Sequence, residues 1–552
     1  MNLVTFFEKF EQFAEAPRGV EKMRELVLKM ATTGHIAEQD PKDTPALHVL
    51  EQIVTQREKL IAKGLAKNRI EGSPISAGDT PEIPGSWVRC MISEVCDLQT
   101  GATPSRQEQR YFGGEIPWLV SGDVNKGEIV ECEGRITELG LQESNCKIIP
   151  PNSVLIALNG QGKTRGTVAV LRIPAALNQS LVAMIPYSRE HLLPEYIFWN
   201  LRGRYYAIRD ITGQDQRRGL NMKIVSQLSL PIPPVAEQRR IVAKVTQLMA
   251  LCTRLEAEQQ ERDARQVALS RAALDRFAKA ATATNLEFLF HTSYSIPPAD
   301  LRKSILTLAV EGRLVPQDPK DEPVETTFRG LEPLDQESTV NAAVPNQWRR
   351  CTYRSLTSLV TSGSRGWKEF YSKTGALFIR TQNIKTDRLV FDDVAFVKLP
   401  KSAEGMRAQV LENDILVTIT GANVTKAARV ENQIPEAYVS QHIALTRPRW
   451  PEMSAWLHLC FISHGSARGV LERLAYGDKP GLNLNNIRDL IMPVPPLAEQ
   501  RRIATRVHQL LALVDDLEAQ LTASTAAAAS LLEAVVAELT TGPGVQSGGN
   551  SR

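Results

Sequence analysis

The residues with the clearest chemical potential are Gly160-Gln-Gly-Lys-Thr164, which look like the end of a phosphate-binding loop. Such a loop needs the pattern G-x-x-x-x-G-K-[ST] and then a helix, so that backbone amides and the helix dipole converge on the phosphates. Here Ala157 occupies the position of the first glycine, and the following TVAVLRIP has the pattern of a strand. The sequence therefore favours a glycine-rich hairpin that carries Lys163 over a nucleotide site.

Other catalytic and metal-binding patterns are missing from the sequence. The cysteines are odd in number and include no C-x-x-C pair, so neither a disulfide framework nor a zinc ribbon is indicated. His458 and His464 are six residues apart and do not share a helix face as i, i+4 ligands would. No G-x-S-x-G, H-E-x-x-H, kinase, helicase or amino-methyltransferase motif occurs. We therefore expect no catalytic residue, no metal site and no cofactor in this chain.

Composition indicates a soluble, multidomain protein without a strong charge bias. The 552 residues include 65 Lys plus Arg and 62 Asp plus Glu, for a formal net charge of +3. This balance excludes a strongly basic histone-like binder, although a local basic patch can still bind nucleic acid. The N-terminal residues lack the pattern of a signal peptide, and no run of about 18 apolar residues occurs. We expect a cytoplasmic protein with no membrane partner.

The elements that would position a site are duplicated. LPIPPVAEQRRI at 230–241 returns as MPVPPLAEQRRI at 492–503, and QDPKD at 39–43 returns at 317–321. Weaker echoes keep the same order between them: IPGSWVRC (83–90) with VPNQWRRC (344–351), SVLIALNG (153–160) with DILVTITG (414–421), and Gly-Leu-Asn at 219–221 and 481–483. A period this long, present only twice, indicates duplication of a whole domain. The first copy has an additional helical stretch, 46–63.

Each P-x-P-P-x-A-E-Q-R-R-I segment is predicted to begin a long helix. Pro234 and Pro496 suit the first helical turn, and Glu237 and Glu499 are favoured there by the helix dipole. Apolar residues then recur in heptads at Ile241, Val245, Leu248, Cys252 and Leu255, and at Ile503, Val507, Leu510, Val514, Leu517 and Leu521. Such a seam is typical of a coiled coil. We expect the two helices to pack antiparallel on one another; independent amphipathic helices on separate cores are the alternative.

The fold class that follows is α+β, with two tandem β-rich domains separated by two long antiparallel coiled-coil helices in a pseudo-twofold, circular repeat. IVECEG, SVLIAL, TVAVLRI, ALFIRT and DILVTIT read as strands, and 193–211 reads as a helix. The predicted parts are an N-terminal helical segment (1–82), β-rich domains (83–231 and 344–493), a central helical region (232–343), a C-terminal long helix (494–540) and a tail expected to be flexible (541–552).

Polar residues suited to DNA contact gather in corresponding predicted loops of both copies. Lys and Arg neutralise phosphates, whereas Arg, Asn and Gln can distinguish base edges in the major groove. The candidates are Thr103, Ser105, Arg106, Arg110, Ser121, Asp123, Lys126, Lys163, Arg165, Arg217 and Arg218 in the first copy, and Ser364, Arg365, Lys368, Arg380, Gln382, Asn383, Lys426 and Lys479 in the second. The copies share a framework and differ in these loops, as two domains reading different sequences would.

These features together resemble the specificity subunit of type I restriction-modification enzymes. The resemblance rests on two P-x-P-P-x-A-E-Q-R-R-I segments, each after a β-rich domain and before a heptad helix, and it covers essentially the whole chain. TGATPSR (100–106), WLVSGDV (118–124) and GQGK (160–163) are similar to motifs of that family's target recognition domains. In the second copy TSGSRGW (361–367) and FIRTQNI (378–384) depart from those motifs.

The resemblance implies a DNA-recognition subunit that has no catalytic activity by itself. Two target recognition domains would each read half of an asymmetric, bipartite site in double-stranded DNA, with helix length setting the spacing. Two modification subunits with S-adenosylmethionine would methylate adenine at N6, and two restriction subunits would use ATP and Mg²⁺. The resemblance assigns subunit assembly to Ala236, Glu237, Gln238, Arg239, Arg240, Ile241, Ala498, Glu499, Gln500, Arg501, Arg502 and Ile503.

Two other classes of function stay open at this point. A self-contained DNA methyltransferase or endonuclease with an unrecognised site would modify DNA as the purified chain alone. A coiled-coil scaffold that binds only proteins would show no salt-dependent DNA binding, even with its partners present.

Overall fold

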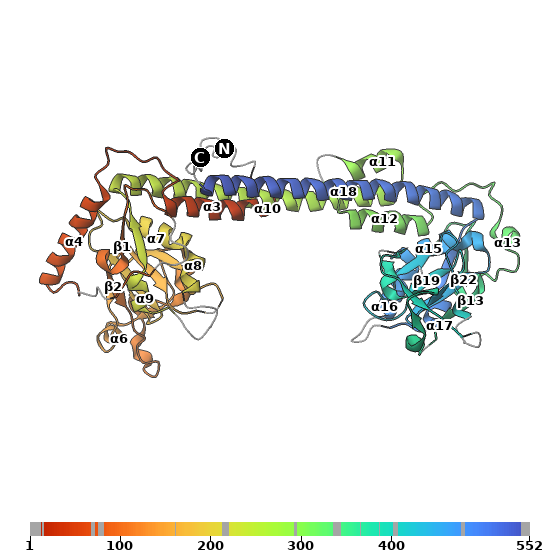
Figure 1. The fold of residues 1–552 in the computed structure, drawn as a ribbon, viewed down its shortest axis with the longest axis horizontal. Coiled ribbons are helices and arrows are strands. Elements are labelled where there is room, and N and C mark those ends of the chain that lie inside the picture. Colours follow the sequence, from red (N-terminus) through yellow and green to blue (C-terminus); the bar gives the residue numbers. More distant parts are fainter. Residues whose placement is uncertain are drawn as a thin grey trace, which may run out of the picture. The chain divides into compact units, whose positions relative to one another are not determined.

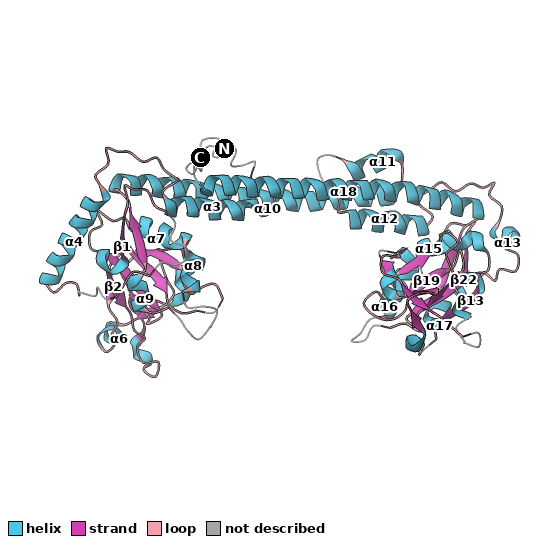
Figure 2. Ribbon diagram, viewed as in Figure 1, coloured by secondary structure: helices cyan, strands magenta, loops and turns pink. Residues whose placement is uncertain are grey.

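The chain divides into two compact units. The computed structural model describes residues 13, 16–67, 72–75, 82–160, 162–211, 220–291, 295–334, 344–364, 366–385, 387–400, 407–475 and 481–541. Unit 1 comprises Met1–Gln260 and Thr525–Arg552, and unit 2 comprises Glu261–Ser524. The boundaries fall inside helices α10 (Val235–Lys279) and α18 (Leu497–Thr541), so each unit contains part of both. Each unit mixes helices with strands (Figure 1, Figure 2).

Helices of unit 1 build an apolar core against the first part of α10. The shorter helices are α3 (Gly19–Thr33), α4 (Ala46–Ala62), α5 (Ile92–Val95), α6 (Glu138–Gln142), α7 (Pro194–Gly203), α8 (Tyr205–Asp210) and α9 (Met222–Gln227). All five predicted heptad residues from Ile241 to Leu255 are buried, in one cluster with Leu532 and Val535 of α18. Heptad spacing therefore identified the buried face of this part of α10.

Two sheets form the β-rich part of unit 1. A two-stranded ladder joins the first and last strands of this β-rich part, because β1 (Val88–Met91) pairs antiparallel with β11 (Ser229–Ile232). The first sheet has the order β2 (Cys96–Thr100), β10 (Leu181–Pro186), β7 (Ser153–Ala157), β8 (Val168–Leu171), β4 (Glu128–Ile129). The second has the order β5 (Arg135–Ile136), β3 (Phe112–Leu119), β9 (Ala175–Leu177), β6 (Ile148–Ile149). One buried cluster with Leu155 and Leu177 joins the two sheets.

Unit 2 repeats this architecture with its own strands. The ladder that joins the ends is β12 (Arg349–Thr352) with β23 (Ile491–Val494). One sheet has the order β13 (Thr357–Ser362), β22 (Ile443–Pro448), β19 (Ile415–Thr418), β20 (Ala427–Arg429). The other has the order β14 (Tyr371–Ser372), β18 (Ala395–Val397), β15 (Ala376–Ile379), β21 (Ala437–Val439), beside a hairpin of β16 (Ile384–Lys385) and β17 (Arg388–Leu389).

Helices of unit 2 pack on the first part of α18. The shorter helices are α11 (Ala283–Glu287), α12 (Pro298–Val310), α13 (Val324–Thr327), α14 (Tyr353–Leu356), α15 (Ser454–Ile462), α16 (Ala467–Leu474) and α17 (Leu484–Arg488). Ile503, Val507, Leu510 and Val514 are buried in a cluster with Ala273 and Phe277 of α10, whereas Leu521 is 37% exposed. The predicted seam therefore holds as far as Val514 and weakens toward Leu521.

Helix 193–211 was predicted as one element and is two. The backbone leaves helical geometry at Arg204 (φ −108°, ψ 17°), between α7 and α8. Gly203 lies against α3, where an added Cβ would be 2.9 Å from Thr32 Cγ2, and the Arg204 guanidinium donates to Asn200 Oδ1 at 3.3 Å. The break therefore falls where Gly203 packs closely on α3 and Arg204 bonds to Asn200, and it places α8 separately from α7.

Two further predictions concern local structure. The additional stretch of the first copy is helical, as α4. Among the described residues, one helix, Leu497–Glu538, is long and apolar enough to cross a membrane by length and composition, a test that a core helix of a soluble protein also passes.

Candidate nucleic-acid interface

A buried clasp joins the start of α10 to the β-rich part of unit 1. Glu237 Oε1 accepts hydrogen bonds from Trp87 Nε1 and from Gln39 Nε2, both at 2.9 Å. One turn later, Arg240 Nη2 donates to Asp43 Oδ2 at 2.6 Å. Gln39 and Asp43 are the first and last residues of the QDPKD segment, so this repeat serves to hold the helix start.

Unit 2 contains the same clasp, residue for residue. Glu499 Oε2 accepts from Trp348 Nε1 at 2.9 Å, and Glu499 Oε1 accepts from Gln317 Nε2 at 2.6 Å. Arg502 Nη2 donates to Asp321 Oδ2 at 2.6 Å. The sequence repeats therefore encode the same clasp twice. In each unit the clasp attaches the sheets to the long helix of that unit.

The clasp bears on the twelve residues predicted to serve subunit assembly. Glu237, Gln238, Ile241, Glu499, Gln500 and Ile503 are buried within their own units. Ala236, Arg239, Ala498 and Arg501 are exposed, and Arg240 and Arg502 are partly exposed within their ion pairs. Burial raises the pKa of the Glu237 and Glu499 carboxyls, against the opposite effect of their tryptophan partners. The exposed members are the ones that a partner subunit could reach.

In unit 1, four connections leave the same edge of the sheets. At the start of β10, Leu181 pairs with Ala157, the last residue of β7, and Val182 pairs with Thr100, the last residue of β2. Strands β2 and β7 therefore end where β10 begins. In the second sheet β3 and β9 run parallel with Leu119 opposite Leu177, and Ala102 N–H donates to the Leu177 carbonyl at 2.9 Å. These registers bring together the segments 101–108, 120–127, 158–167 and 178–180.

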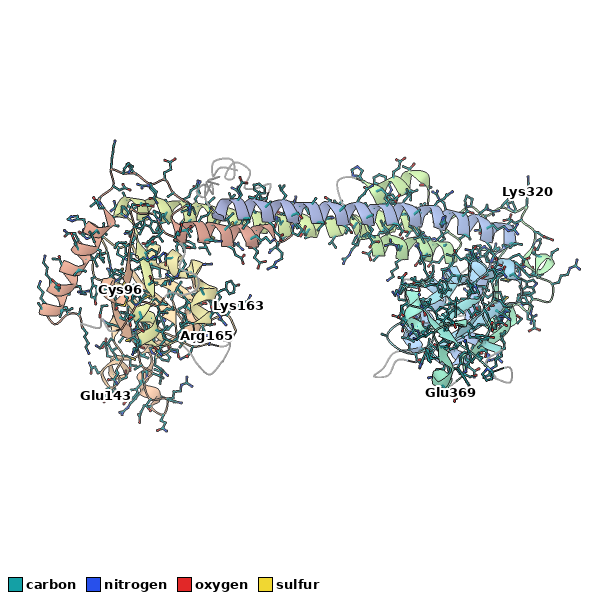
Figure 3. The ribbon with its side chains drawn as sticks, in the orientation of Figure 1. Cys96, Glu143, Lys163, Arg165, Lys320 and Glu369 are labelled. Carbon is teal, nitrogen blue, oxygen red and sulfur yellow. The ribbon has the colours of Figure 1, made fainter. Side chains whose placement is uncertain are left out.

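Lys163 lies in the connection between β7 and β8, which is the predicted hairpin. The loop uses positive backbone φ at Gly162 (+64°) and Gly166 (+81°), a conformation that glycine adopts without strain. The Lys163 side chain is exposed, whereas Arg165 is partly buried (Figure 3). No helix follows the lysine, because β8 begins at Val168, so the loop lacks the helix N-terminus of a P-loop.

The other candidates of unit 1 divide into exposed and internally bonded groups. Ser105, Arg106 and Lys126 are exposed, and the Thr103 hydroxyl donates to Gln179 Oε1 at 2.5 Å. Arg110 precedes β3, at the opposite end of that strand from Ser121, and pairs with Glu108 at 2.9 Å. Ser105, Arg106, Lys126 and Lys163 are therefore the exposed candidates of this sheet edge, and Arg110 lies away from it.

Asp123 has a local structural role in the 3₁₀ segment Ser121–Lys126. Its Oδ2 accepts from the Val120 backbone N–H at 2.9 Å and so caps the segment. In unit 2, Asn383 Oδ1 does the same for the Arg380 N–H at 3.0 Å, in the 3₁₀ segment Thr381–Asn383. In both segments the capping side chain lies three residues after the backbone N–H that it binds.

The matching edge of unit 2 carries fewer freely exposed candidates. Ser362, Thr418 and Ala427 lie at the strand ends that the registers of β13, β22, β19 and β20 place together. Arg380 Nη2 donates to the Asp393 carbonyl at 3.1 Å, and Gln382 Nε2 donates to Asp393 Oδ2 at 2.5 Å. These two side chains, with Asn383, thus hold the segment around Asp393. Ser364 and Lys426 are partly buried.

Several predicted residues lie outside the described part of the chain. They are Arg217, Arg218, Arg365 and Lys479, together with the side chain of Lys368. Sequence reasoning also missed residues that shape these loops, above all Tyr205, Arg209, Asp387 and Arg468, because their bonding partners are distant in the sequence. Among the described residues, no group of three or more His, Cys, Asp or Glu side chains could hold a metal ion.

Comparison with known proteins identifies the class of domain. Residues 84–262, which contain the sheets of unit 1 and the start of α10, match the family described as type I restriction modification DNA specificity domain. The specificity subunit of the EcoAI type I restriction enzyme of Escherichia coli is 24% identical over 89% of this chain and 89% of its own length. The corresponding EcoEI subunit of Escherichia coli is 25% identical over 91% of each chain.

A solved structure of an HsdS subunit from Thermoanaerobacter tengcongensis covers 84% of this chain and 99% of its own, with 17% identity and a TM-score of 0.44. The family match and the two relatives, each aligned over about nine-tenths of both chains, show that this chain is similar to specificity subunits of type I restriction enzymes. Its unit 1 carries the DNA specificity domain that the match defines.

Proposed function

We propose that each unit reads one half of an asymmetric, bipartite site in double-stranded DNA. The observation that carries this proposal is the repetition of one framework with different loop residues. Each unit has the same clasp and the same connections at one sheet edge. At that edge unit 1 presents exposed Arg106 and Lys163, whereas in unit 2 the Arg380 and Gln382 side chains bond to Asp393. A common frame with different surfaces is what two different half-sites require.

The exposed cations of unit 1 suit contact with the DNA backbone and with bases. Lysine supplies a point charge for phosphates, and arginine can donate two hydrogen bonds to guanine. A serine hydroxyl beside them, as at Ser105, can bond to phosphate or base edges. Arg217 and Arg218 of the first copy, and Arg365, Lys368, Lys426 and Lys479 of the second, stay candidates for the same role.

The long helices α10 and α18 would then set the distance between the half-sites. The proposal takes them as an antiparallel coiled coil, supported by the buried heptad residues in each unit and by Leu532 and Val535 packing with the first part of α10. Inserting one heptad after Leu255, with a matching heptad in α18, should lengthen the recognised spacer and leave both half-sites unchanged. An unchanged spacer would reject the role of the helices as a ruler.

The catalytic steps would belong to partner subunits. We propose that this chain has no catalytic activity and no cofactor of its own, and that two modification subunits supply S-adenosylmethionine and adenine-N6 methylation. Two restriction subunits would supply ATP- and Mg²⁺-dependent translocation and cleavage. Exposed Arg239 and Arg501, near the helix starts, are the proposed assembly contacts.

A methylation map tests the proposed function directly. The chain is co-expressed with its modification subunit, and modified adenines are mapped in the host genome. Arg106→Ala and Lys163→Ala should lower methylation at the bipartite motif, whereas Arg189→Ala is the matched control. Arg189 is also exposed, but it follows β10 at the end opposite to Leu181. Equal effects of all three variants, or methylation without a bipartite motif, would contradict the proposal.

A further inference from the structure

An arginine and a tyrosine on α8 hold the loop that carries Lys163. Arg209 Nη2 donates to the Gly162 carbonyl at 2.9 Å, and Nη1 donates to the Arg165 carbonyl at 3.0 Å. The Tyr205 hydroxyl donates to the Lys163 carbonyl at 2.6 Å and accepts from Arg209 Nη1 at 2.9 Å. Two side chains of one short helix therefore bond three carbonyls of a loop of ten residues, 158–167.

These bonds add to the loop's own bonds, in which the Gly166 N–H donates to the Ala157 carbonyl at 2.9 Å and the Thr167 hydroxyl donates to the Lys163 carbonyl at 2.8 Å. Positive φ values at Gly162 and Gly166 make its backbone conformationally permissive. An added Cβ on Gly166 would be 3.3 Å from Arg209 Cγ, so the arginine stem also packs against the loop. The hydrogen bond to the Lys163 carbonyl fixes the backbone of this residue, and it therefore also fixes the position of the Cβ atom from which the exposed side chain extends.

In unit 2, a different arginine acts on the corresponding loop, 419–426. Arg468 on α16 is 4% exposed, and its Nη2 donates to the Thr425 carbonyl at 3.3 Å. Its guanidinium also forms a two-point ion pair with Asp387, with Nη1 to Oδ2 at 2.7 Å. Asp387 in turn accepts from the Ala427 backbone N–H at 3.1 Å, where β20 begins. The loop with Lys426 is thus tied to the β16–β17 hairpin.

The two arginines occupy corresponding places in the repeated architecture. Each lies on the short helix that follows the helix packed on the first sheet, α7 or α15, and each reaches the loop between equivalent strands. An asparagine also links each loop to the capped 3₁₀ segment: Asn125 Nδ2 to Thr164 Oγ1 at 3.4 Å, and Asn423 Nδ2 to the Thr381 carbonyl at 3.1 Å. Each unit therefore fixes the backbone of the corresponding loop, but it does so with different side chains.

We infer that Arg209 and Arg468 are positioning residues for DNA recognition, each setting the specificity of one half-site only. This inference rests on the proposed function, since it assumes that the loops with Lys163 and Lys426 face DNA. Neither guanidinium needs to touch DNA, because both already donate to carbonyls of their loops. Burial of Arg468, at 4% exposure, makes this clear for unit 2.

The expected result is a loss of discrimination that is confined to one half of the motif. A displacement of about 1 Å in a positioned group can reduce a reaction about 100-fold, so methylation of the cognate site should fall by about 10- to 100-fold. Arg209→Lys should relax one half-site, and Arg468→Lys should relax the other. Lysine keeps the positive charge beside Asp387 but cannot span two acceptors as the planar guanidinium does.

The experiment uses the complex of this chain with its modification subunit. Plasmid libraries with one half-site randomised at a time are methylated and sequenced, and thermal unfolding of each complex is measured alongside. Tyr205→Phe tests the same loop by removing a single hydroxyl. Arg473→Ala, an exposed arginine on the same helix as Arg468, is the matched control.

The outcomes separate this inference from the proposed function. If the wild-type complex methylates no bipartite motif, the proposed function fails. If it does, and the variants weaken both half-sites equally in step with a lower unfolding temperature, the arginines are only structural and the inference is overturned. Unchanged specificity in both lysine variants would overturn it too. Relaxation of a single half-site by each variant, with Arg473→Ala unaffected, supports it.

Discussion

The bond between Trp87 and Glu237 should stabilise unit 1 by a measurable amount. Trp87 is 7% exposed, and its Nε1 lies 2.9 Å from Glu237 Oε1. A hydrogen bond to a charged acceptor contributes about 1.5–3 kcal/mol. Trp87→Phe also removes part of a buried ring, at a further cost of about 1 kcal/mol. We expect a total loss of about 3 kcal/mol, or about 6–12 °C in the unfolding temperature of a unit of this size.

A double-mutant cycle separates the hydrogen bond from the lost ring atoms. Trp87→Phe and Glu237→Gln are measured singly and together by calorimetry at pH 7. Because glutamine Oε1 can still accept from Trp87 Nε1, the coupling energy measures the advantage of the charged acceptor over the neutral one and should be about 1 kcal/mol. The matched control replaces Trp199, a partly buried tryptophan that packs edge-on against Phe198, by Phe. Its coupling to Glu237→Gln should be about zero, within about 0.5 kcal/mol.

The repeat supplies an independent copy of the experiment. Trp348→Phe with Glu499→Gln should give the same coupling in unit 2, where the bond is also 2.9 Å long. A coupling energy below about 0.5 kcal/mol in both units would refute the assignment of the clasp as the device that secures each β-rich part to its helix.

Three further predictions concern packing and pH. Gly101→Ala should prevent soluble folding of unit 1, because an added Cβ would lie 1.7 Å from the Leu177 carbonyl oxygen; soluble yield and circular dichroism check this. Leu510→Ala should cost about 2–5 kcal/mol in denaturant unfolding, whereas Leu513→Ala, 49% exposed on the same helix, should cost less than about 0.5 kcal/mol. Burial lowers the pKa of His458, so the unfolded state binds the proton more tightly and stability is lost as pH falls below the unfolded value of 6.5. His458→Phe, which copies Phe198 of unit 1, should remove that part of the pH dependence between pH 7 and 5; an equal slope in the variant would exclude His458 as its source.

The framework could be predicted from the sequence because its signals are local or repeated. Heptad spacing identified the buried residues from Ile241 to Leu255, and the glycine-rich segment at 160–164 was correctly read as a hairpin. The QDPKD repeat indicated that this segment is important, but its structural role could not be predicted. The bonds from Gln39 and Asp43 to α10 join residues almost 200 positions apart in the sequence. Repetition shows that a segment matters, and only the fold shows what it touches.

The loop residues were less predictable, because residue type does not tell a reading side chain from a holding one. Asp123 and Asn383 were chosen as polar candidates, yet both cap their own 3₁₀ segments. Arg380 and Gln382 have the right chemistry for bases but bond to Asp393. Conversely, nothing local in the sequence sets Arg209 apart from the neighbouring Arg202 and Arg204.

Separating holding from reading residues changes how the specificity of such a unit would be altered. Exposed side chains such as Arg106 and Lys163 can be exchanged while the bonds from Tyr205 and Arg209 remain, because these bonds are made to loop carbonyls. Exchange of the whole segment 158–167 is different, since its backbone conformation was fitted to Tyr205 and Arg209. A transplanted loop should therefore carry its own helix-borne arginine with it, together with the partner that the arginine bonds, such as Asp387 in unit 2. Under the proposed function, one set of side chains at this sheet edge would set the backbone position of the loop, and the other set would present charge to DNA.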